Sequence, residues 1–395
     1  MSRRVVITGI GVVSALGLGV DENNCALQKG RTGISSVQHL NTRLRDEFVL
    51  GEVKFSNERL KELLNIAPHK KVSRTSLLAF HAGKEAVEMA GLKADELKSC
   101  AFISGTTVGG MDLTEQITDF YSEKDLAEIL ALHSCGDSTE KTAAFLGAGG
   151  FTTTYSTACS SAANAIMLGG RLIKSGRVDR VIAGGTDALS CFTLNGFNSL
   201  MILDRNHCRP FDISRAGLNL GEGAGFIVME AENVVKPGKA LAYLSGYANS
   251  NDAHHQTASS SEGIGATFSM QKALAVAGIK PNEVTYINAH GTGTPNNDSS
   301  EAKAIATVFG KNIPEYSSTK SFTGHTLGAC GGVEAAFSIL SIHNQELYAG
   351  LNFSQADDDI ESKPIVEYKK AKVNHVLSNS FGFGGNNSTL IFSKI

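Results

Sequence analysis

One cysteine of the sequence lies where a fold would activate a nucleophile. Cys159 stands in TACSSAA, after the β-rich run FTTTYST and before a run of small, helix-compatible residues. A strand-to-helix turn there would place its sulfur at a helix N-terminus, which carries about half a positive charge and unpaired N–H groups. Both favour the thiolate, the nucleophilic form of cysteine. A buried structural cysteine is the alternative interpretation of this segment.

Two histidines lie in glycine-rich segments further along the chain. His290, in NAHGTGTP, follows the apolar strand VTYIN and so stands at the carboxyl end of a strand, where α/β folds bind ligands. His325 lies in KSFTGHTLGA, and GGVE follows it. A charge pair between Lys320 and Glu334 would support this site; a surface lysine and a helix carboxylate are the alternative.

A loop-like segment near the C-terminus, residues 379–387, reads NSFGFGGNN. Three glycines around one aromatic residue suit a gate or a backbone-donor oxyanion hole, and they also suit a plain β-turn. The chain has no Walker A motif and no G-x-G-x-x-G in the setting that dinucleotide binding requires. The sequence therefore predicts no dinucleotide site.

A cysteine with two histidines is compatible with two chemistries. A Cys/His hydrolase would use one histidine as a base and add water to the acyl-enzyme. A Claisen condensing enzyme would hold an acyl thioester on the cysteine and form a carbanion beside it by decarboxylating a malonyl thioester. Two imidazole N–H donors would stabilise the enolate, and loss of one such donor typically costs about 10²–10³ in rate. Two histidines in this setting fit condensation better.

The composition excludes several classes of protein. The chain has 395 residues, 36 Lys+Arg and 39 Asp+Glu, and this balance is not that of a nucleic-acid-binding protein. No run of apolar residues is long enough to span a membrane, and the N-terminal Val/Ile alternation predicts a buried strand rather than a signal peptide. Seven cysteines without a C-x-x-C predict neither a disulfide framework nor a zinc cluster, which favours the cytoplasm and no bound metal.

Strands and helices are expected to alternate, which predicts an α/β fold. Helices are expected over residues 76–89 and 268–277, and the polar segment 123–141 is expected to be a surface excursion. The expected strands are 5–7, 100–104, 152–155, 180–183, 225–230, 284–288, 376–379 and 389–392.

Internal similarity predicts a duplicated unit. AGLK at residues 90–93 returns as AGIK at 277–280, and in both copies a helix ends on a glycine suited to a left-handed C-cap. Ala158-Cys159 and Ala329-Cys330 each precede a helix of small residues, and VDRV at 178–181 matches VNHV at 373–376. The join lies near the polar turn ENVVKPGK, so two halves are expected, 1–235 with the cysteine and 236–395 with both histidines.

These segments together resemble the elongating β-ketoacyl-[acyl-carrier-protein] synthases. The resemblance rests on TACSS, NAHGTGTP, KSFTGH and NSFGFGGN, with RRVVITGIGVVSALG at the start and RPFD…GLNLGEGAG in mid-chain, and it covers essentially the whole sequence. It implies the thiolase fold, in which two similar α/β halves form a five-layered αβαβα core. It also implies an acyltransferase that binds acyl carrier protein and forms a homodimer, with a heterodimer as the alternative.

The resemblance also implies a role for each matching residue. Cys159 would accept the acyl group, and His290 and His325 would bind the malonyl thioester and promote its decarboxylation. Lys320 and Glu334 would order the site. No cofactor would be bound by the enzyme itself, because phosphopantetheine arrives on the carrier protein.

The gate and the substrate channel follow from the same match. The backbone N–H groups of Cys159 and Phe383 would form the oxyanion hole, and Phe383 would gate acyl access. The remaining implied substrate-binding positions are Thr292 and Thr294 at the pantetheine, Asp252 and the glycines Gly382 and Gly384 at the gate, and Val108 in the acyl tunnel. Acyl carrier protein is acidic, so its docking candidates are basic: Lys70, Lys71, Arg74 and Arg205.

Several departures from the family pattern leave alternatives open. The stretch 189–212 looks trimmed, and Thr257-Ala258 lacks the proline that often follows the aspartate loop. The expected function is chain elongation in fatty acid or polyene/polyketide-like synthesis, and these departures suggest a divergent subgroup that serves a specialised polyene or polyketide-like pathway instead of bulk fatty acid synthesis. A non-catalytic chain-length-factor-like subunit is the second hypothesis. A non-decarboxylating thiolase, with Cys330 as its second cysteine, is the third.

Overall fold

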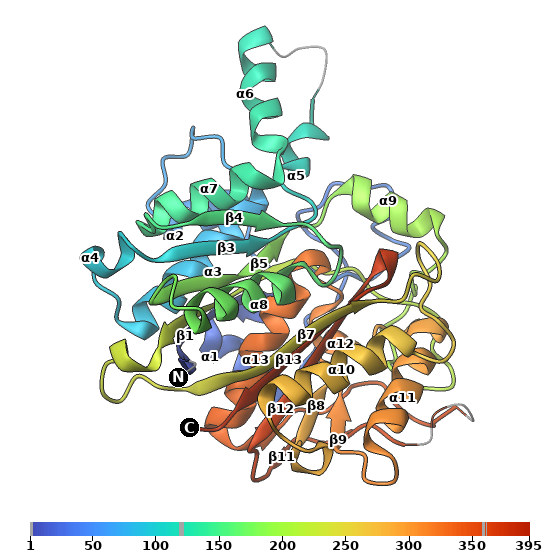
Figure 1. Cartoon of the computed structure of the whole chain (residues 1–395). Coiled ribbons are helices and arrows are strands. Elements are labelled where there is room, and N and C mark those ends of the chain that lie inside the picture. Colours follow the sequence, from blue (N-terminus) through green and yellow to red (C-terminus); the bar gives the residue numbers. More distant parts are fainter. Residues whose placement is uncertain (1–2, 118–121, 358–359, 361) are drawn as a thin grey trace.

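A mixed β-sheet with the same strand order in both halves forms the frame of the molecule. The computed structural model describes residues 3–117, 122–357, 360 and 362–395. In this part of the chain, ten strands pair in the order β4-β3-β5-β6-β1-β7-β13-β12-β8-β9, and β2 pairs with β1. Figure 1 shows these strands across the middle of the molecule, with helices packed on their faces.

Each half contributes five of the ten strands, and the halves are topological copies. The first half contains β1 (Val5–Ser14), β3 (Ala101–Gly105), β4 (Thr152–Tyr155), β5 (Arg180–Asp187) and β6 (Gly223–Ala231). The second contains β7 (Ala242–Asn251), β8 (Tyr286–Asn288), β9 (Glu315–Ser317), β12 (His375–Gly382) and β13 (Asn386–Ser393). In both, the spatial order is third, second, fourth, fifth, first, and the pattern of parallel and antiparallel pairs is the same. The predicted duplication is therefore confirmed, and the predicted division at residue 235 lies between β6 and β7.

The helices complete five layers. α3 (Arg74–Ala90) covers β1 and β6, and its counterpart α10 (Ile264–Ala277) covers β7 and β13. Both end on a left-handed glycine, Gly91 with φ 67° and Gly278 with φ 69°, as the AGLK/AGIK repeat predicts. α8 (Ser161–Lys174) and α13 (Cys330–Asn344) lie between the two halves (Figure 1). The expected α/β thiolase fold is confirmed.

Small residues let the central helices approach the sheet closely. A Cβ on Gly225 of β6 would lie 2.2 Å from the carbonyl carbon of Gly332 on α13, so backbone meets backbone there. α13 is buried from Cys330 to Ile342, which explains why its sequence is almost entirely apolar or small. This packing fixes the position of the helix that follows the second histidine.

Sequence patterns missed or misassigned some elements. β7 and β9 were not expected, and the predicted surface excursion at 123–141 is only partly right. α6 (Glu123–His133) stands away from the body (Figure 1), whereas α7 (Cys135–Leu146) packs on α3 and β4 through buried Ala143 and Leu146. The many polar residues of this segment suggested a surface loop, although Ala143 and Leu146 give α7 an apolar face.

The other elements are short, apart from α11 (Pro295–Phe309), which packs against α10. They are α1 (Val20–Gln28), α2 (Asn57–Leu63), α4 (Ala94–Leu97), α5 (Met111–Thr114), α9 (Cys191–Ser199), α12 (Lys320–Thr323), β2 (Gly17–Leu18), β10 (Glu346–Leu347) and β11 (Lys369–Lys370). Across the described ranges, no helix has both the length and the apolar character that crossing a membrane needs.

Candidate active site

Cys159 stands at a strained turn between β4 and α8, as the sequence predicts. Ala158 has φ 51°, a left-handed conformation that is unusual for a residue with a side chain. The Ser161 hydroxyl donates to the Ala158 carbonyl at 2.6 Å and accepts from the Thr157 N–H at 2.9 Å, which holds the turn. Cys159 is 6% exposed, directly before the first turn of α8.

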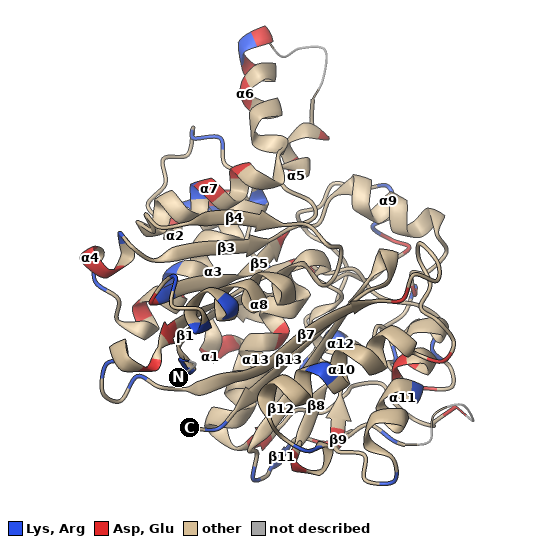
Figure 2. Ribbon diagram, in the orientation of Figure 1, with Lys and Arg blue, Asp and Glu red and all other residues tan. Residues whose placement is uncertain are grey.

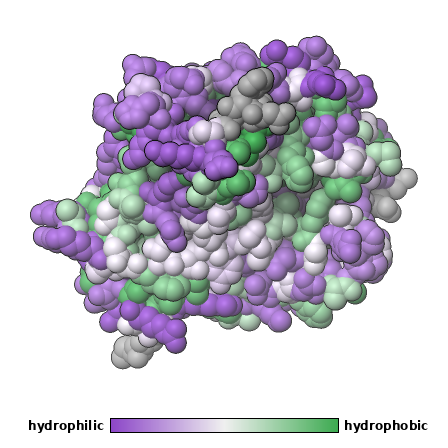
Figure 3. Space-filling view, turned by 90° about the horizontal axis from the view of Figure 1, so that it is seen from above, coloured by the Kyte–Doolittle hydropathy of each residue, from purple (hydrophilic) through white to green (hydrophobic). Residues whose placement is uncertain are grey.

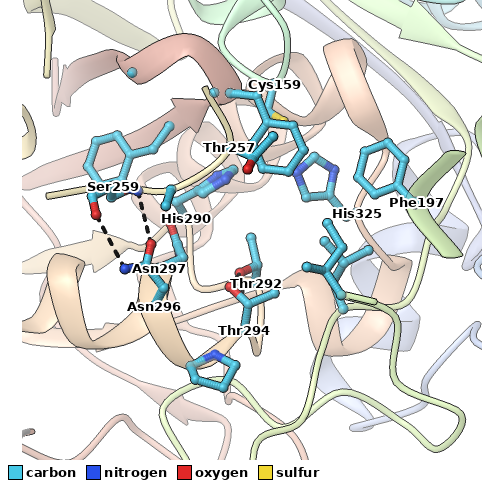
Figure 4. Close-up of a pocket in the computed structure, with 18 residues that line it drawn as sticks. Cys159, Phe197, Thr257, Ser259, His290, Thr292, Thr294, Asn296, Asn297 and His325 are labelled. Atoms are coloured by element: carbon cyan, nitrogen blue, oxygen red, sulfur yellow. Dashed lines mark hydrogen bonds between the residues drawn. The ribbon is translucent and has the colours of Figure 1, made fainter. Parts of the chain in front are cut away.

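Both histidines meet this cysteine, although they lie in the other half. One nitrogen of His290, one nitrogen of His325 and the Cys159 sulfur all lie within 4.8 Å of one another. The two imidazole rings are nearly perpendicular at 88°, with centroids 5.4 Å apart. His290 follows β8 and His325 follows α12, so the duplicated fold brings three separate loops to one point (Figure 4).

Hydrogen bonds to the far side of each ring assign the tautomers. The Nδ1 of His325 accepts the Leu327 N–H at 3.0 Å, and the Nδ1 of His290 lies 3.2 Å from the Lys320 ammonium, which has only protons to offer. Each imidazole therefore carries its proton on Nε2. Burial, with the nearby Lys320 charge, lowers the pKa of His325 to about 3 and that of His290 well below its usual value. Both rings are neutral N–H donors at pH 7.

Lys320 and Glu334 form the predicted charge pair, and it is buried. Their side chains are 2% and 3% exposed, and the ammonium donates to the carboxylate. Burial raises the pKa of Glu334 to about 7, with Lys320 acting in the opposite direction. Burial alone would lower the pKa of Lys320, but the Glu334 charge reverses this, so the lysine stays charged and fixes the His290 ring.

The cysteine itself differs from the expected thiolate. Burial raises the pKa of Cys159 to about 11, although the Lys320 charge and the backbone N–H groups of Phe383 and Cys159 lower it. Desolvation therefore outweighs the helix N-terminus, and the group is a thiol at neutral pH. It must lose its proton during the reaction.

The glycine-rich loop after β12 covers this sulfur. The N–H groups of Phe383 and Cys159 both lower the pKa of this thiol, and that they form an oxyanion hole stays a prediction. A Cβ on Gly382 would lie 2.9 Å from the Thr157 carbonyl oxygen and 3.1 Å from the Cys159 nitrogen, so a side chain here would crowd the nucleophile turn. Gly384 has φ 80°, and the Phe383 ring stacks on Phe197 of α9 with centroids 5.8 Å apart.

A neighbouring strap, residues 252–260, joins this loop to α11. At one end, the Asp252 N–H donates to the Gly385 carbonyl at 2.9 Å and the Gly384 N–H donates to the Gln256 carbonyl at 2.7 Å. At the other end, the Asn296 side chain accepts the Ser259 N–H at 2.9 Å and donates to the Ser259 carbonyl at 3.2 Å (Figure 4). The strap therefore connects the loop over Cys159 to the mouth of the cavity.

The cavity beside Cys159 has a volume of about 340 Å³ and two kinds of wall. Its apolar wall includes Phe197, Ile202 and Leu218. Its polar wall includes Thr292 and Thr294, whose hydroxyl oxygens lie 2.8 Å apart. Figure 3 shows apolar side chains beside the hollows of the molecular face that is seen from above. A substrate with one apolar and one polar segment fits this cavity.

Comparison with known proteins agrees with this geometry. The family models "Beta-ketoacyl synthase, N-terminal domain" and "Beta-ketoacyl synthase, C-terminal domain" match residues 2–234 and 241–354. The chain belongs to the β-ketoacyl synthase family. It is 33% identical to 3-oxoacyl-[acyl-carrier-protein] synthase 2 of Staphylococcus aureus (strain COL), over 100% of this chain and 99% of the relative.

Solved structures that contain a ketosynthase and a chain length factor share the fold over the whole chain. The ishigamide ketosynthase/chain length factor has a TM-score of 0.92 at 31% identity, covering 100% of both chains. A chain of the complex of the ketosynthase ApeO with its chain length factor ApeC, from Xenorhabdus doucetiae, has a TM-score of 0.82 at 32% identity, covering 100% of this chain and 98% of that one.

Two carboxylates of this ketosynthase hold the His290 loop and were not singled out from the sequence. Glu301 of α11 accepts the N–H groups of His290 at 2.9 Å and Gly291 at 2.8 Å. Asp298, one turn earlier, accepts those of Thr292 and Gly293. The only sequence signal was the three-residue spacing of the two acids in PNNDSSE, which puts both on one helix face.

Two expected site residues are buried. Val108 is 2% exposed and belongs to an apolar cluster with Leu189, Leu194 and Leu218, of which Leu218 also lines the cavity; its place in an acyl tunnel stays a prediction. Arg74 was expected at a docking surface, but it is buried and its guanidinium donates to Glu222 at 2.6 and 2.8 Å. The docking prediction for Arg74 is wrong, because this cation stabilises a buried carboxylate.

The other docking candidates remain at the surface. Lys71 pairs with Asp125 and Glu128 of α6 at 2.7 and 2.9 Å, and Arg205 lies 3.1 Å from Glu47. Lys70 is exposed. Figure 2 shows charges of both signs on α6, so its basic neighbours are partly neutralised.

The site also has the composition of a metal centre. Cys159, His290 and His325 form one group of possible ligands. In a second group, the ligand atoms of His290, Cys330 and Glu334 lie within 4.8 Å of one another. Glu334 is already paired with Lys320, and burial raises the pKa of Cys330 well above its usual value, so the anionic ligands a metal needs are not favoured. That the site works without a metal stays a prediction.

Proposed function

We propose that this ketosynthase condenses a Cys159-bound acyl group with malonyl-acyl carrier protein, releasing CO₂ and forming 3-oxoacyl-acyl carrier protein. The observation that carries the proposal is the pair of neutral imidazoles whose Nε2–H groups share one cavity with a cysteine thiol. A hydrolase would need one of these histidines as a base, and imidazoles with such low pKa values are poor bases. As hydrogen-bond donors they suit an enolate.

In the first step, the Cys159 sulfur attacks the thioester carbonyl of the acyl carrier protein. The N–H groups of Cys159 and Phe383 stabilise the oxyanion. The C–S bond to the carrier then breaks, and the proton of the cysteine ends on the departing pantetheine thiol. Displacement of the Phe383 ring gives the acyl group access to the cavity.

In the second step, a malonyl thioester enters along Thr292 and Thr294. His290 and His325 donate to its carbonyl oxygen while the carboxylate leaves as CO₂, and the electron pair forms the enolate. The enolate carbon attacks the acyl group, the C–S bond to Cys159 breaks, and the thiolate takes up a proton from solvent water. Lys320 and Glu334 act on His290, which they keep in the donating tautomer. Phosphopantetheine is brought by the carrier, and the enzyme supplies no cofactor.

We propose acyl carrier protein as the partner, docked near Lys70, Lys71 and Arg205, and a cytoplasmic location. The name of the Staphylococcus aureus relative supports the carrier, since it specifies an acyl-carrier-protein substrate. The retained Cys159, His290 and His325 favour a catalytic subunit over a chain-length-factor-like one. The protein forms a homodimer; native mass spectrometry tests this against a heterodimer with a second chain, the arrangement named for ApeO and ApeC.

Mass spectrometry of the intact protein tests the reaction. After incubation with saturated, polyene and aryl acyl carrier proteins, we expect the mass of one acyl group on Cys159 and, once malonyl carrier is added, a 3-oxoacyl product. Cys159→Ala should abolish both. Full condensation by that variant would refute the proposal, and better turnover of saturated medium chains would place the enzyme in fatty acid rather than polyene synthesis.

A further inference from the structure

A buried carboxylate outside the cavity is bound by both halves of the molecule. Asp187, the last residue of β5, has no exposed surface. The loop after β3 surrounds it: the Thr106 hydroxyl donates at 2.6 Å, the Thr107 N–H and hydroxyl at 2.9 and 2.6 Å, and the Val108 N–H at 3.0 Å. These donors all come from the first half.

The fifth donor comes from the second half. The Gly328 N–H donates to the Asp187 Oδ2 at 2.6 Å. A Cβ on Gly328 would lie 2.7 Å from the same oxygen, so glycine is required for this contact. The bond joins residues 141 positions apart, and it fixes the turn that directly follows His325.

That turn determines the tautomer of the second histidine. Leu327, which precedes Gly328, has φ 53°, a left-handed conformation that a residue with a side chain adopts only when its surroundings impose it. In this conformation its N–H donates to the His325 Nδ1 at 3.0 Å. Without that donor, His325 could place its proton on either nitrogen, and the Nε2–H would no longer be assured.

We propose that Asp187 is a positioning residue, which holds the Leu327–Gly328 turn so that His325 presents its Nε2–H to the malonyl thioester. Asp187 is not among the residues that line the cavity, and it acts on Cys159 only through its charge, which is a minor cause of the raised pKa of that thiol. Its loss is therefore expected to slow decarboxylation, which uses the His325 donor, and to leave acyl transfer to Cys159 unchanged or slightly faster, because the charge that raises the thiol pKa is removed. This inference rests on the proposed function.

Asp187→Asn changes this contact with almost no change in shape. An amide oriented with its oxygen toward the Thr107 and Val108 N–H groups keeps those bonds, and its NH₂ group then faces the Gly328 N–H. Two donors cannot pair, so the turn loses its anchor. We expect malonyl decarboxylation to fall at least about tenfold, and by no more than the 10²–10³ that loss of a whole donor typically costs. Single-turnover acylation of Cys159 should stay within about twofold.

Thr106→Val is the matched control, because it removes a donor to the same carboxylate on the side away from His325. It should lower the free energy of unfolding but leave the ratio of decarboxylation to acylation unchanged. Gly328→Ala is the second variant, since its methyl group would push the carboxylate away without altering its charge. It should reproduce the kinetic signature of Asp187→Asn even if that variant does not fold.

Histidine ¹⁵N NMR supplies a readout that a structural role would not change. The wild type should show His325 as the Nε2–H tautomer, identified by comparison with His325→Ala, and Asp187→Asn or Gly328→Ala should show a mixture. An unchanged tautomer in Asp187→Asn and Gly328→Ala, or an equal fall of acylation and decarboxylation in these variants, would overturn the inference. Absence of both steps in the wild type would instead count against the proposed function.

Discussion

Replacing Lys320 with methionine tests the electrostatics of the site most directly. Lys320→Met keeps most of the buried volume but leaves Glu334 without its cation, at a position where both side chains are almost fully buried. Removal of one partner from a buried pair typically costs about 3–5 kcal/mol. It also removes the ammonium from the His290 Nδ1, so we expect malonyl decarboxylation to fall with it.

The loss should depend on pH in a defined direction. Burial raises the pKa of Glu334 to about 7, above its ordinary value of 4.5, and Lys320 holds that pKa down. Without Lys320 the folded pKa rises above 7. Above pH 7 the folded variant then retains a proton that the unfolded chain has lost, so its free energy of unfolding falls as pH rises, by about 1.4 kcal/mol per pH unit.

Urea unfolding at pH 7 and 8.5 measures this slope. Over 1.5 pH units Lys320→Met should lose up to about 2 kcal/mol, and the wild type, in which Glu334 is already about half ionised at pH 7, should lose clearly less. The double variant Lys320→Met/Glu334→Gln has no titrating group at this position, so it should recover stability and lose the extra slope. Parallel pH profiles for the wild type and Lys320→Met, or an extra slope that persists in the double variant, would refute the reasoning.

Three further outcomes follow from the same geometry. Alkylation of Cys159 by iodoacetamide should accelerate about tenfold per pH unit between pH 7 and 9, because burial raises its pKa to about 11; a plateau below pH 9 would contradict this. Phe197→Ala removes a ring stack of about 0.5–1.5 kcal/mol from Phe383 and should speed acyl loading about two- to tenfold in rapid-quench assays; slower loading would be inconsistent with a gate. Asn296→Ala frees the strap at Ser259 from α11 and should raise the same rate about threefold, with a change in stability below about 1 kcal/mol. An unchanged rate would show that the strap does not control the Phe383 gate.

The fold was predictable because its pattern is local and repeated. Alternating apolar strands and glycine-capped helices can be read within short windows, and the AGLK/AGIK repeat lies where both helices end on left-handed glycines. β7 was missed because its sequence, AYLSGYANSN, mixes glycine and polar residues with apolar ones. Its place beside β1 is decided by pairing across the join, which no local window contains.

The sequence by itself determined which chemical groups the site has. Cys159, His290, His325, Lys320 and Glu334 were all identified from residue types in short segments, because the side chain of a residue is fixed by the sequence alone. Even the strand-to-helix turn at Cys159 was predicted from its neighbours. The intrinsic chemistry of these five side chains therefore follows from the sequence, without knowledge of the fold.

Only the tertiary structure decided the state of those groups. Cys159 is a thiol rather than a thiolate because it is buried, and Arg74 is unavailable for docking because Glu222, 148 residues away, binds it. The His325 tautomer depends on a turn that Asp187, 141 residues from Gly328, holds in place. Proton positions and pKa values follow from desolvation and from partners distant in sequence, and folding alone brings those partners together.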